Sequence, residues 1–125
     1  MKQNVKPQIS EKAFTKQIID LARLFGWKAA HFRPALTQRG RWVTAVQGDG
    51  AGFPDLVLVH RGKGRVIFVE LKTQIGKLSE KQEQWLDALC EVEKRYCALT
   101  GHDWVVRCAV WRPSQFDEIT KILWD

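Results

Sequence analysis

Apolar side chains recur at three- and four-residue spacing near the start of the chain, a pattern typical of a helix with one buried face. We expect this helix over residues 10–25, with Ser10 as its N-cap and Gly26 as its C-terminal stop. Its buried stripe is predicted to be Phe14, Ile18, Leu21, Ala22 and Phe25.

A second segment with helical spacing begins at Ser79 and Gln82, which form the S-x-x-Q pattern of a capping box. The helix is expected to run to Thr100, with Gly101 as its stop. Its apolar positions are Trp85, Leu86, Leu89, Val92, Tyr96 and Leu99. A further capping box that starts at Ser114 predicts a short helix at the end of the chain.

Short runs rich in β-branched and aromatic residues predict the strands, at residues 27–33, 41–47, 55–59, 65–72 and 104–111. Residues 34–40 are expected to be loop. Strands 55–59 and 65–72 are apolar on both faces, so helices should cover both sides of the sheet. The order of elements predicts an α/β domain with a mixed sheet. We expect residues 10–125 to form this single domain and residues 1–9 to be a flexible arm.

Positive charge is concentrated in the middle of the chain. The net charge is +6, and residues 23–77 hold ten basic and three acidic residues, whereas residues 78–125 hold six basic and nine acidic ones. Such a field is typical of a protein that binds a polyanion, although a solvated basic surface has the same composition. No run of about 18 apolar residues exists, so no membrane contact is expected.

The three cysteines, Cys90, Cys97 and Cys108, are an odd number and form no C-x-x-C pair. We expect reduced and mostly buried thiols. A zinc site formed by Cys97, His102 and Cys108 is an alternative, but its spacing fits no common pattern. The first residues lack the apolar core of a signal peptide, so we expect the protein to remain in the cytoplasm.

The residues that carry chemistry lie on two neighbouring strands. If the turn between these strands is centred near residues 62–63, Asp55 lies directly opposite Glu70, and Lys72 shares their face. Two carboxylates that face each other across a strand pair repel, and burying them without a partner costs free energy. Mg²⁺, which prefers carboxylate and carbonyl oxygens, would offset the repulsion. An ordinary carboxylate–lysine salt bridge is the alternative.

The residues around this pair resemble the VRR-NUC branch of the PD-(D/E)XK nucleases. The resemblance covers residues 10–124. The compact size of the chain is similar to that of stand-alone, phage-type members. It rests on Gly52 to Leu56, Glu70 to Lys72, Leu78, Ser79, Gln82 and Trp85, with Glu11, Phe14 and Trp111 to Pro113 as further matches. One departure is the helix after Ser79, which is longer than usual.

The resemblance implies a restriction-endonuclease-like αβββαβ core and roles for individual residues. Asp55, Glu70 and the backbone carbonyl of Leu71 would bind Mg²⁺ or Mn²⁺, and Lys72 would orient water or stabilise the phosphate. Glu11 corresponds to an acidic residue that points toward the metal; it also suits the first turn of a helix, where the helix dipole favours an acid. Gln82 corresponds to a polar residue near the active site, and this role can coexist with the capping box.

Basic and aromatic residues near these elements are candidates for DNA contacts. Trp42 is the candidate for base stacking. The candidates for phosphate contacts are Arg33, Arg39, Arg41, Lys63, Arg65, Lys77 and Lys81. The glycine run at Gly48, Gly50 and Gly52 precedes a strand rather than a helix, so no nucleotide cofactor is expected.

These observations favour a metal-dependent endonuclease that acts on branched DNA. Resemblance to the stand-alone members implies a homodimer that resolves four-way junctions in a bacterial or phage-infected cell. Its contact is expected at apolar residues of the second and third helices, namely Tyr96, Leu99, Phe116 and Trp124. The alternatives are a nonspecific or flap-directed monomeric nuclease and, from another class, a non-catalytic DNA-binding module with the same fold.

Overall fold

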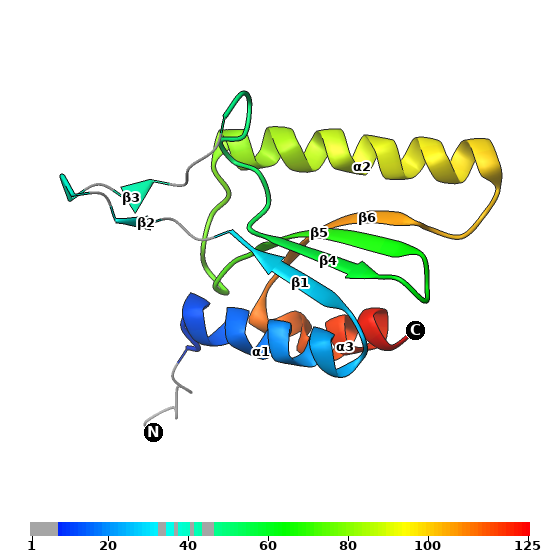
Figure 1. The fold of residues 1–125 in the computed structure, drawn as a ribbon, viewed down its shortest axis with the longest axis horizontal. Coiled ribbons are helices and arrows are strands. Elements are labelled where there is room, and N and C mark those ends of the chain that lie inside the picture. The colour runs from blue at the N-terminus through cyan, green and yellow to red at the C-terminus, as the bar shows by residue number, and fades with distance from the viewer. Residues whose placement is uncertain (1–7, 33–34, 37, 41, 44–46) are drawn as a thin grey trace, which may run out of the picture.

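The computed structural model describes residues 8–32, 35–36, 38–40, 42–43 and 47–125 (Figure 1). The helices in these ranges are α1 (Glu11–Leu24), α2 (Glu80–Thr100) and α3 (Phe116–Trp124), and the 3₁₀ turn η1 (Pro113–Gln115) precedes α3. The main sheet contains β1 (Lys28–His31), β4 (Leu56–His60), β5 (Arg65–Leu71) and β6 (Val106–Trp111). Strands β2 (Ala35–Leu36) and β3 (Trp42–Val43) pair with each other separately.

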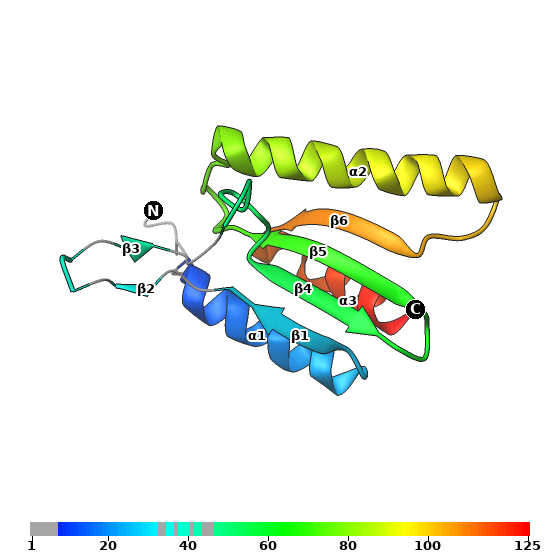
Figure 2. The same ribbon diagram turned by 45° about the horizontal axis from the view of Figure 1, so that its top comes forward.

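The main sheet is mixed, with strand order β1-β4-β5-β6. The pairs β1–β4 and β4–β5 are antiparallel, and β5–β6 is parallel because α2 connects the two strands. Helices α1 and α3 cover one face of this sheet and α2 covers the other (Figures 1 and 2). The α/β class and the two covered faces are therefore confirmed, and they agree with a restriction-endonuclease-like core.

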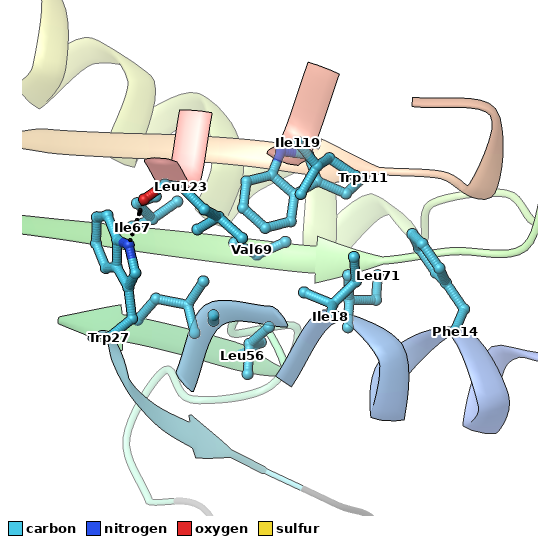
Figure 3. Packing of buried hydrophobic residues seen from close by; sticks show 12 residues of the cluster. Phe14, Ile18, Trp27, Leu56, Ile67, Val69, Leu71, Trp111, Ile119 and Leu123 are labelled. Atoms are coloured by element: carbon cyan, nitrogen blue, oxygen red, sulfur yellow. Dashed lines mark hydrogen bonds between the residues drawn. The ribbon is translucent and has the colours of Figure 1, made fainter. Parts of the chain in front are cut away.

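The densest core lies between the sheet and the pair α1 and α3 (Figure 3). Its fully buried side chains include Phe14, Ile18, Leu56, Leu71, Ile119 and Leu123. Burying one such side chain contributes about 1.5–3 kcal/mol. The Trp27 indole donates a hydrogen bond of 2.9 Å to the Leu123 carbonyl, which fixes the end of α3 against β1. This core holds β4 and β5, the strands that position the site described below.

Two of the predicted helix caps are confirmed and one is wrong. The Ala13 amide donates to Ser10 Oγ at 3.1 Å, and the Ser79 capping box is complete. Ser114 caps nothing, because Pro113 already begins a 3₁₀ turn there, and the Ser114 amide donates instead to Gln74 Oε1. The N-cap of α3 is Gln115, so the helix starts one residue later than the box predicts.

Two further expectations change. Part of the predicted loop 34–40 is a strand, because Ala35–Leu36 pairs with Trp42–Val43. The far half of α2 carries apolar residues that the spacing placed in a buried stripe, but Val92 is 54% exposed and Leu99 86% exposed. Figures 1 and 2 show that α2 extends past the ends of β5 and β6, so its last turns, which include Leu99, have no sheet to cover.

The cysteine prediction is wrong for two of the three thiols. Cys90 of α2 and Cys108 of β6 form a disulfide, and Cys97 is free. Strand β6 turns Cys108 toward α2, and the two Cα atoms are 5.7 Å apart, within the reach of a disulfide. The alternative zinc set with His102 is therefore not assembled, since Cys108 is already bonded. No helix in the described ranges is long and apolar enough to cross a membrane.

Candidate active site

The β4–β5 register brings Asp55 and Glu70 together at the open end of the hairpin. Leu56 pairs with Val69 and His60 with Arg65, so the next position pairs Asp55 with Glu70, as the sequence predicted. Asp55 directly precedes β4, and Glu70 is the last residue but one of β5. Both carboxylates point away from the apolar core on the opposite face, because side chains alternate along a strand.

Each carboxylate is held by the backbone of the other strand. The Leu71 amide donates to Asp55 Oδ1 at 3.2 Å, and the Asp55 amide donates to Glu70 Oε2 at 3.3 Å. These reciprocal bonds fix both side chains without neutralising their charge. Asp55 Oδ2 accepts no hydrogen bond from any side chain that the structure describes. An oxygen in this state can bind a ligand that enters the site.

Two further predicted residues contact Glu70 Oε1. Gln82 donates to this oxygen from Nε2 at 2.9 Å, while its own Oε1 accepts the Ser79 amide at 2.8 Å. Gln82 therefore closes the capping box of α2 and contacts the carboxylate pair at the same time. Lys72 Nζ lies 3.8 Å from the same oxygen, and its side chain is 15% exposed.

Burial raises the pKa of both carboxyl groups. The pKa of Asp55 is raised to about 6, chiefly by desolvation, and the nearby Glu11 carboxylate raises it further. The pKa of Glu70 is raised to about 7 by desolvation and then by the negative charge of Asp55. Lys72 opposes both shifts without cancelling them. Near neutral pH the pair therefore lacks a full counter-charge.

The uncompensated negative charge of this pair is suited to binding a divalent cation. Carboxylate oxygens are ligands that Mg²⁺ and Mn²⁺ prefer, and a cation beside the pair would favour the ionised form of both groups. Glu11 is exposed at the first turn of α1 and acts on both carboxyl groups, which places a third negative charge nearby. The donor set is thus suitable for a hard metal ion.

The site opens into a cleft of about 1260 Å³ between α1 and the loop before β4. Asp55, Glu70, Lys72, Gln82 and Glu11 all line this cleft. The structure therefore brings together every residue that the sequence predicted for the catalytic group.

The loop that borders the cleft is pressed against the start of α2. Gly52 has φ +82°, and a Cβ at this position would lie 2.5 Å from the carbonyl carbon of Lys81. Only glycine permits this approach. The Trp85 indole donates to the Asp49 carbonyl at 2.9 Å and anchors the same loop. This contact aligns Asp55, three residues after Gly52, with Gln82 on α2.

The predicted DNA contacts are dispersed. Lys77 and Lys81 are exposed beside the first turn of α2, and Arg39 is exposed next to the β2–β3 hairpin. Lys63 and Arg65 lie at the other end of the β4–β5 hairpin, far along the strands from the carboxylates. Arg33, Arg41 and the side chain of Trp42 lie outside what the structure describes.

The cleft-lining residues that sequence reasoning missed include three basic residues and one exposed aromatic residue, namely Lys12, Lys16, Arg23 and Phe32. The signal for the three basic residues was available, because they recur on the polar face of α1 at positions compatible with one side of a helix. Phe32 had no comparable signal, since it follows a short strand whose partner could not be assigned from the sequence.

Comparison with known proteins decides the family. The sequence profile of the VRR-NUC domain matches residues 15–103, more than two thirds of the chain. The chain belongs to the VRR-NUC family. No curated protein and no solved structure gives a significant match. As a VRR-NUC domain, the protein is a nuclease of the PD-(D/E)XK type that acts on DNA. The matched segment contains Asp55, Glu70, Lys72 and Gln82, whereas Glu11 precedes it.

Proposed function

We propose that this VRR-NUC protein is a divalent-metal-dependent endonuclease that hydrolyses DNA phosphodiester bonds at Asp55, Glu70 and Lys72. One observation carries the proposal. The half-buried Asp55 and the buried Glu70 face each other across the β4–β5 pair, with raised pKa values and one lysine close by among the described residues, and they open into a cleft. A structural salt bridge would neutralise such a pair, and this arrangement does not.

Mg²⁺ or Mn²⁺ is the proposed cofactor. Asp55, Glu70 and the Leu71 carbonyl would hold the ion, and Glu11 adds negative charge from α1. When bound, such an ion lowers the pKa of a water molecule and polarises the phosphoryl group. The chain's own contribution is to keep both carboxylates oriented and accessible from the cleft.

Lys72 and Gln82 have separate roles in this proposal. The Lys72 ammonium lies on the cleft side of Glu70, where it can hold an anionic phosphate oxygen or orient the attacking water. Gln82 does not bear charge; its amide fixes the rotamer of Glu70 and ties the carboxylate pair to the first turn of α2. Gln82 is therefore a positioning residue.

The substrate that we propose is branched or otherwise structured DNA, cut by a homodimer. One chain carries one Asp55–Glu70 pair, so two paired nicks need two copies. The four predicted contact residues cannot form one patch, because α2 and α3 lie on opposite faces of the sheet (Figure 1). We assign the contact to the exposed end of α2, where Leu99 lies at the opposite end of the helix from Gln82.

A cleavage assay tests the proposal. Linear duplex, single strand, flap and four-way junction are incubated with Mg²⁺, Mn²⁺, Ca²⁺ or EDTA. We expect cleavage with Mg²⁺ or Mn²⁺ and none with EDTA, and we expect Ca²⁺ to support binding without turnover because its coordination is larger and looser. Salt-dependent binding without cleavage under any metal would instead identify a non-catalytic DNA-binding module.

Mass in solution and the cleavage pattern test the dimer. We expect a dimer at micromolar concentration, symmetric nicks on the junction, and loss of both in Leu99→Glu. A strict monomer that nicks junction arms without symmetry, or cuts flaps alone, would leave the flap-directed or nonspecific monomeric nuclease.

A further inference from the structure

We propose that the cleft takes its DNA strand unpaired, with the base beside the scissile phosphate stacked on Phe32. The proposal deepens the function above and rests on it, because it names the form of DNA that reaches Asp55 and Glu70. Three observations carry it: the place of the Phe32 ring, the aromatic side chains that hold the ring, and the charge of the facing helix.

Phe32 is attached directly to the carboxylate site. Its amide donates a 2.7 Å hydrogen bond to the carbonyl of Asp55, so Phe32 stands beside that residue at the end of β1. The side chain lines the same cleft as Asp55 and Glu70, yet it is 45% exposed. An aromatic ring with an accessible surface next to a phosphate site is suited to contact a base.

The ring is also held in place before any ligand binds. Phe53 packs edge to face against Phe32, with ring centroids 5.9 Å apart. Phe53 in turn contacts Phe68 of β5 at 5.9 Å and Trp85 of α2 at 5.1 Å. The exposed ring is therefore the outermost member of an aromatic cluster that is anchored on both the sheet and α2. Such preorganisation lowers the entropy lost when a ligand binds.

Helix α1 supplies a row of cations along the cleft. Lys12, Lys16 and Arg23 all line it from one side of the helix. They outnumber the two acids of α1 that also line it, Glu11 and Asp20. Lys16 is 2.7 Å from Asp20, but both side chains are exposed, so this pair is weak and Lys16 can be drawn to a phosphate. A cationic wall together with an aromatic surface is the combination that single-strand binding grooves use.

The same combination disfavours intact duplex. In a duplex the faces of each base are covered by its neighbours, so Phe32 can stack only on a base that has left the helix. Unstacking costs a few kcal/mol, and it costs least where a strand is already unpaired. Flaps, splayed branch points and single strands therefore suit this cleft best.

Binding in EDTA tests stacking independently of catalysis. A single-stranded oligonucleotide with one 2-aminopurine is titrated with the wild-type protein and with Phe32→Tyr, Phe32→Leu and Phe116→Ala. Phe116 is the matched control, an aromatic residue of α3 that is 37% exposed. We expect quenching by the wild type, Phe32→Tyr and Phe116→Ala. Phe32→Leu keeps apolar volume without an aromatic face, so it should lose the quenching and bind about tenfold more weakly.

Cleavage with Mg²⁺ or Mn²⁺ gives the second readout. Phe32→Leu should lower the rate on single-stranded and flap DNA several-fold more than on duplex, and Phe32→Tyr should restore the wild-type ratio. An equal effect on all substrates, or undiminished quenching by Phe32→Leu, would overturn the inference while leaving the nuclease intact. A protein that quenches normally but cuts nothing would refute the proposed catalysis and not the stacking.

Discussion

The two ends of the β4–β5 hairpin both carry charged side chains, and the fold treats them in opposite ways. At the turn end, Lys63 and Arg65 both have partners within the protein. Arg65 donates to Asp103 at 2.8 Å and lies over the Trp104 ring at 4.3 Å. Lys63 donates to the last carbonyls of α3, at 3.1 Å and 2.7 Å, where the helix dipole favours a cation.

At the open end the charges oppose one another. Asp55 and Glu70 are both acidic, both have raised pKa values, and Lys72 at 3.8 Å is the one cation within salt-bridge distance among the described residues. The turn end thus stabilises the fold, whereas the open end makes the fold less stable than a neutral pair would. A local arrangement that opposes stability in this way is typical of a functional site.

The largest expected effect is on catalysis. Asp55→Asn and Glu70→Gln remove one charge each without changing side-chain size, and we expect each to lower the cleavage rate by at least about a hundredfold. Asp103→Asn is the matched change at the turn end and should leave the rate unchanged. Rates are measured with Mg²⁺ in excess. Wild-type cleavage by either open-end variant would show that the comparison between the two ends has no functional meaning.

The next effect is on stability in the absence of metal. Because folding raises the pKa of Glu70 to about 7, the folded state binds more protons than the unfolded state between pH 4.5 and pH 7. Stability from this group is therefore present at low pH and lost as the pH rises through about 7. Glu70→Gln should have a Tm above that of the wild type at pH 8 in EDTA, by about a few degrees, and no advantage at pH 4.

Mg²⁺ should remove that advantage. A cation that binds the folded state favours the ionised carboxylates and raises the Tm of the wild type at pH 8. It should not raise the Tm of Glu70→Gln to the same extent. The measurement is thermal unfolding of both proteins with and without Mg²⁺. An equal rise in the Tm of both proteins would contradict binding of the cation at Asp55 and Glu70.

A smaller effect, on stability, distinguishes Gly52 from Gly64, which both have a positive φ angle. Gly64 lies in the turn with φ +64° and open space around it, so Gly64→Ala should cost only about 1–2 kcal/mol of backbone strain. Gly52→Ala adds a clash with the backbone of Lys81 at 2.5 Å. It should destabilise the protein more and lower the cleavage rate, because the loop must move away from α2. Urea unfolding and cleavage are compared; equal losses for both variants would show that the close approach is unimportant.

The sequence predicted the open end of the hairpin well because the signals there are local. The turn position sets the register, and the register sets which face Asp55, Glu70 and Lys72 share. The S-x-x-Q box likewise placed Gln82 correctly. The packing of the glycine-rich loop against α2 had no such local signal, because it depends on the distance between elements that are far apart in the chain.

The predictions that were wrong concern contacts between elements that are far apart in the sequence. The pairing of Cys90 with Cys108 and the exposure of Leu99 depend on how far α2 extends across β6, which no local pattern records. Lys63 and Arg65 stay predictions as DNA contacts, but no sequence pattern indicated that both have partners within the protein. Their partners, the end of α3 and Asp103, are distant in the sequence and become visible only in the fold.

The smallest expected effect compares the turn end and the open end of the β4–β5 hairpin as DNA contacts. Arg65→Gln removes one exposed ion pair and one contact with Trp104, so we expect it to cost about 1 kcal/mol of stability and to leave DNA affinity unchanged. Lys81→Gln, beside Gln82 at the open end, should leave stability unchanged and weaken DNA binding. Removal of one phosphate contact should also reduce the slope of log affinity against log salt by about 0.9. Binding is measured by titration at several salt concentrations. If Arg65→Gln reduced the slope and Lys81→Gln did not, the DNA would cross the turn end of the hairpin, and the assignment of the two ends would be reversed.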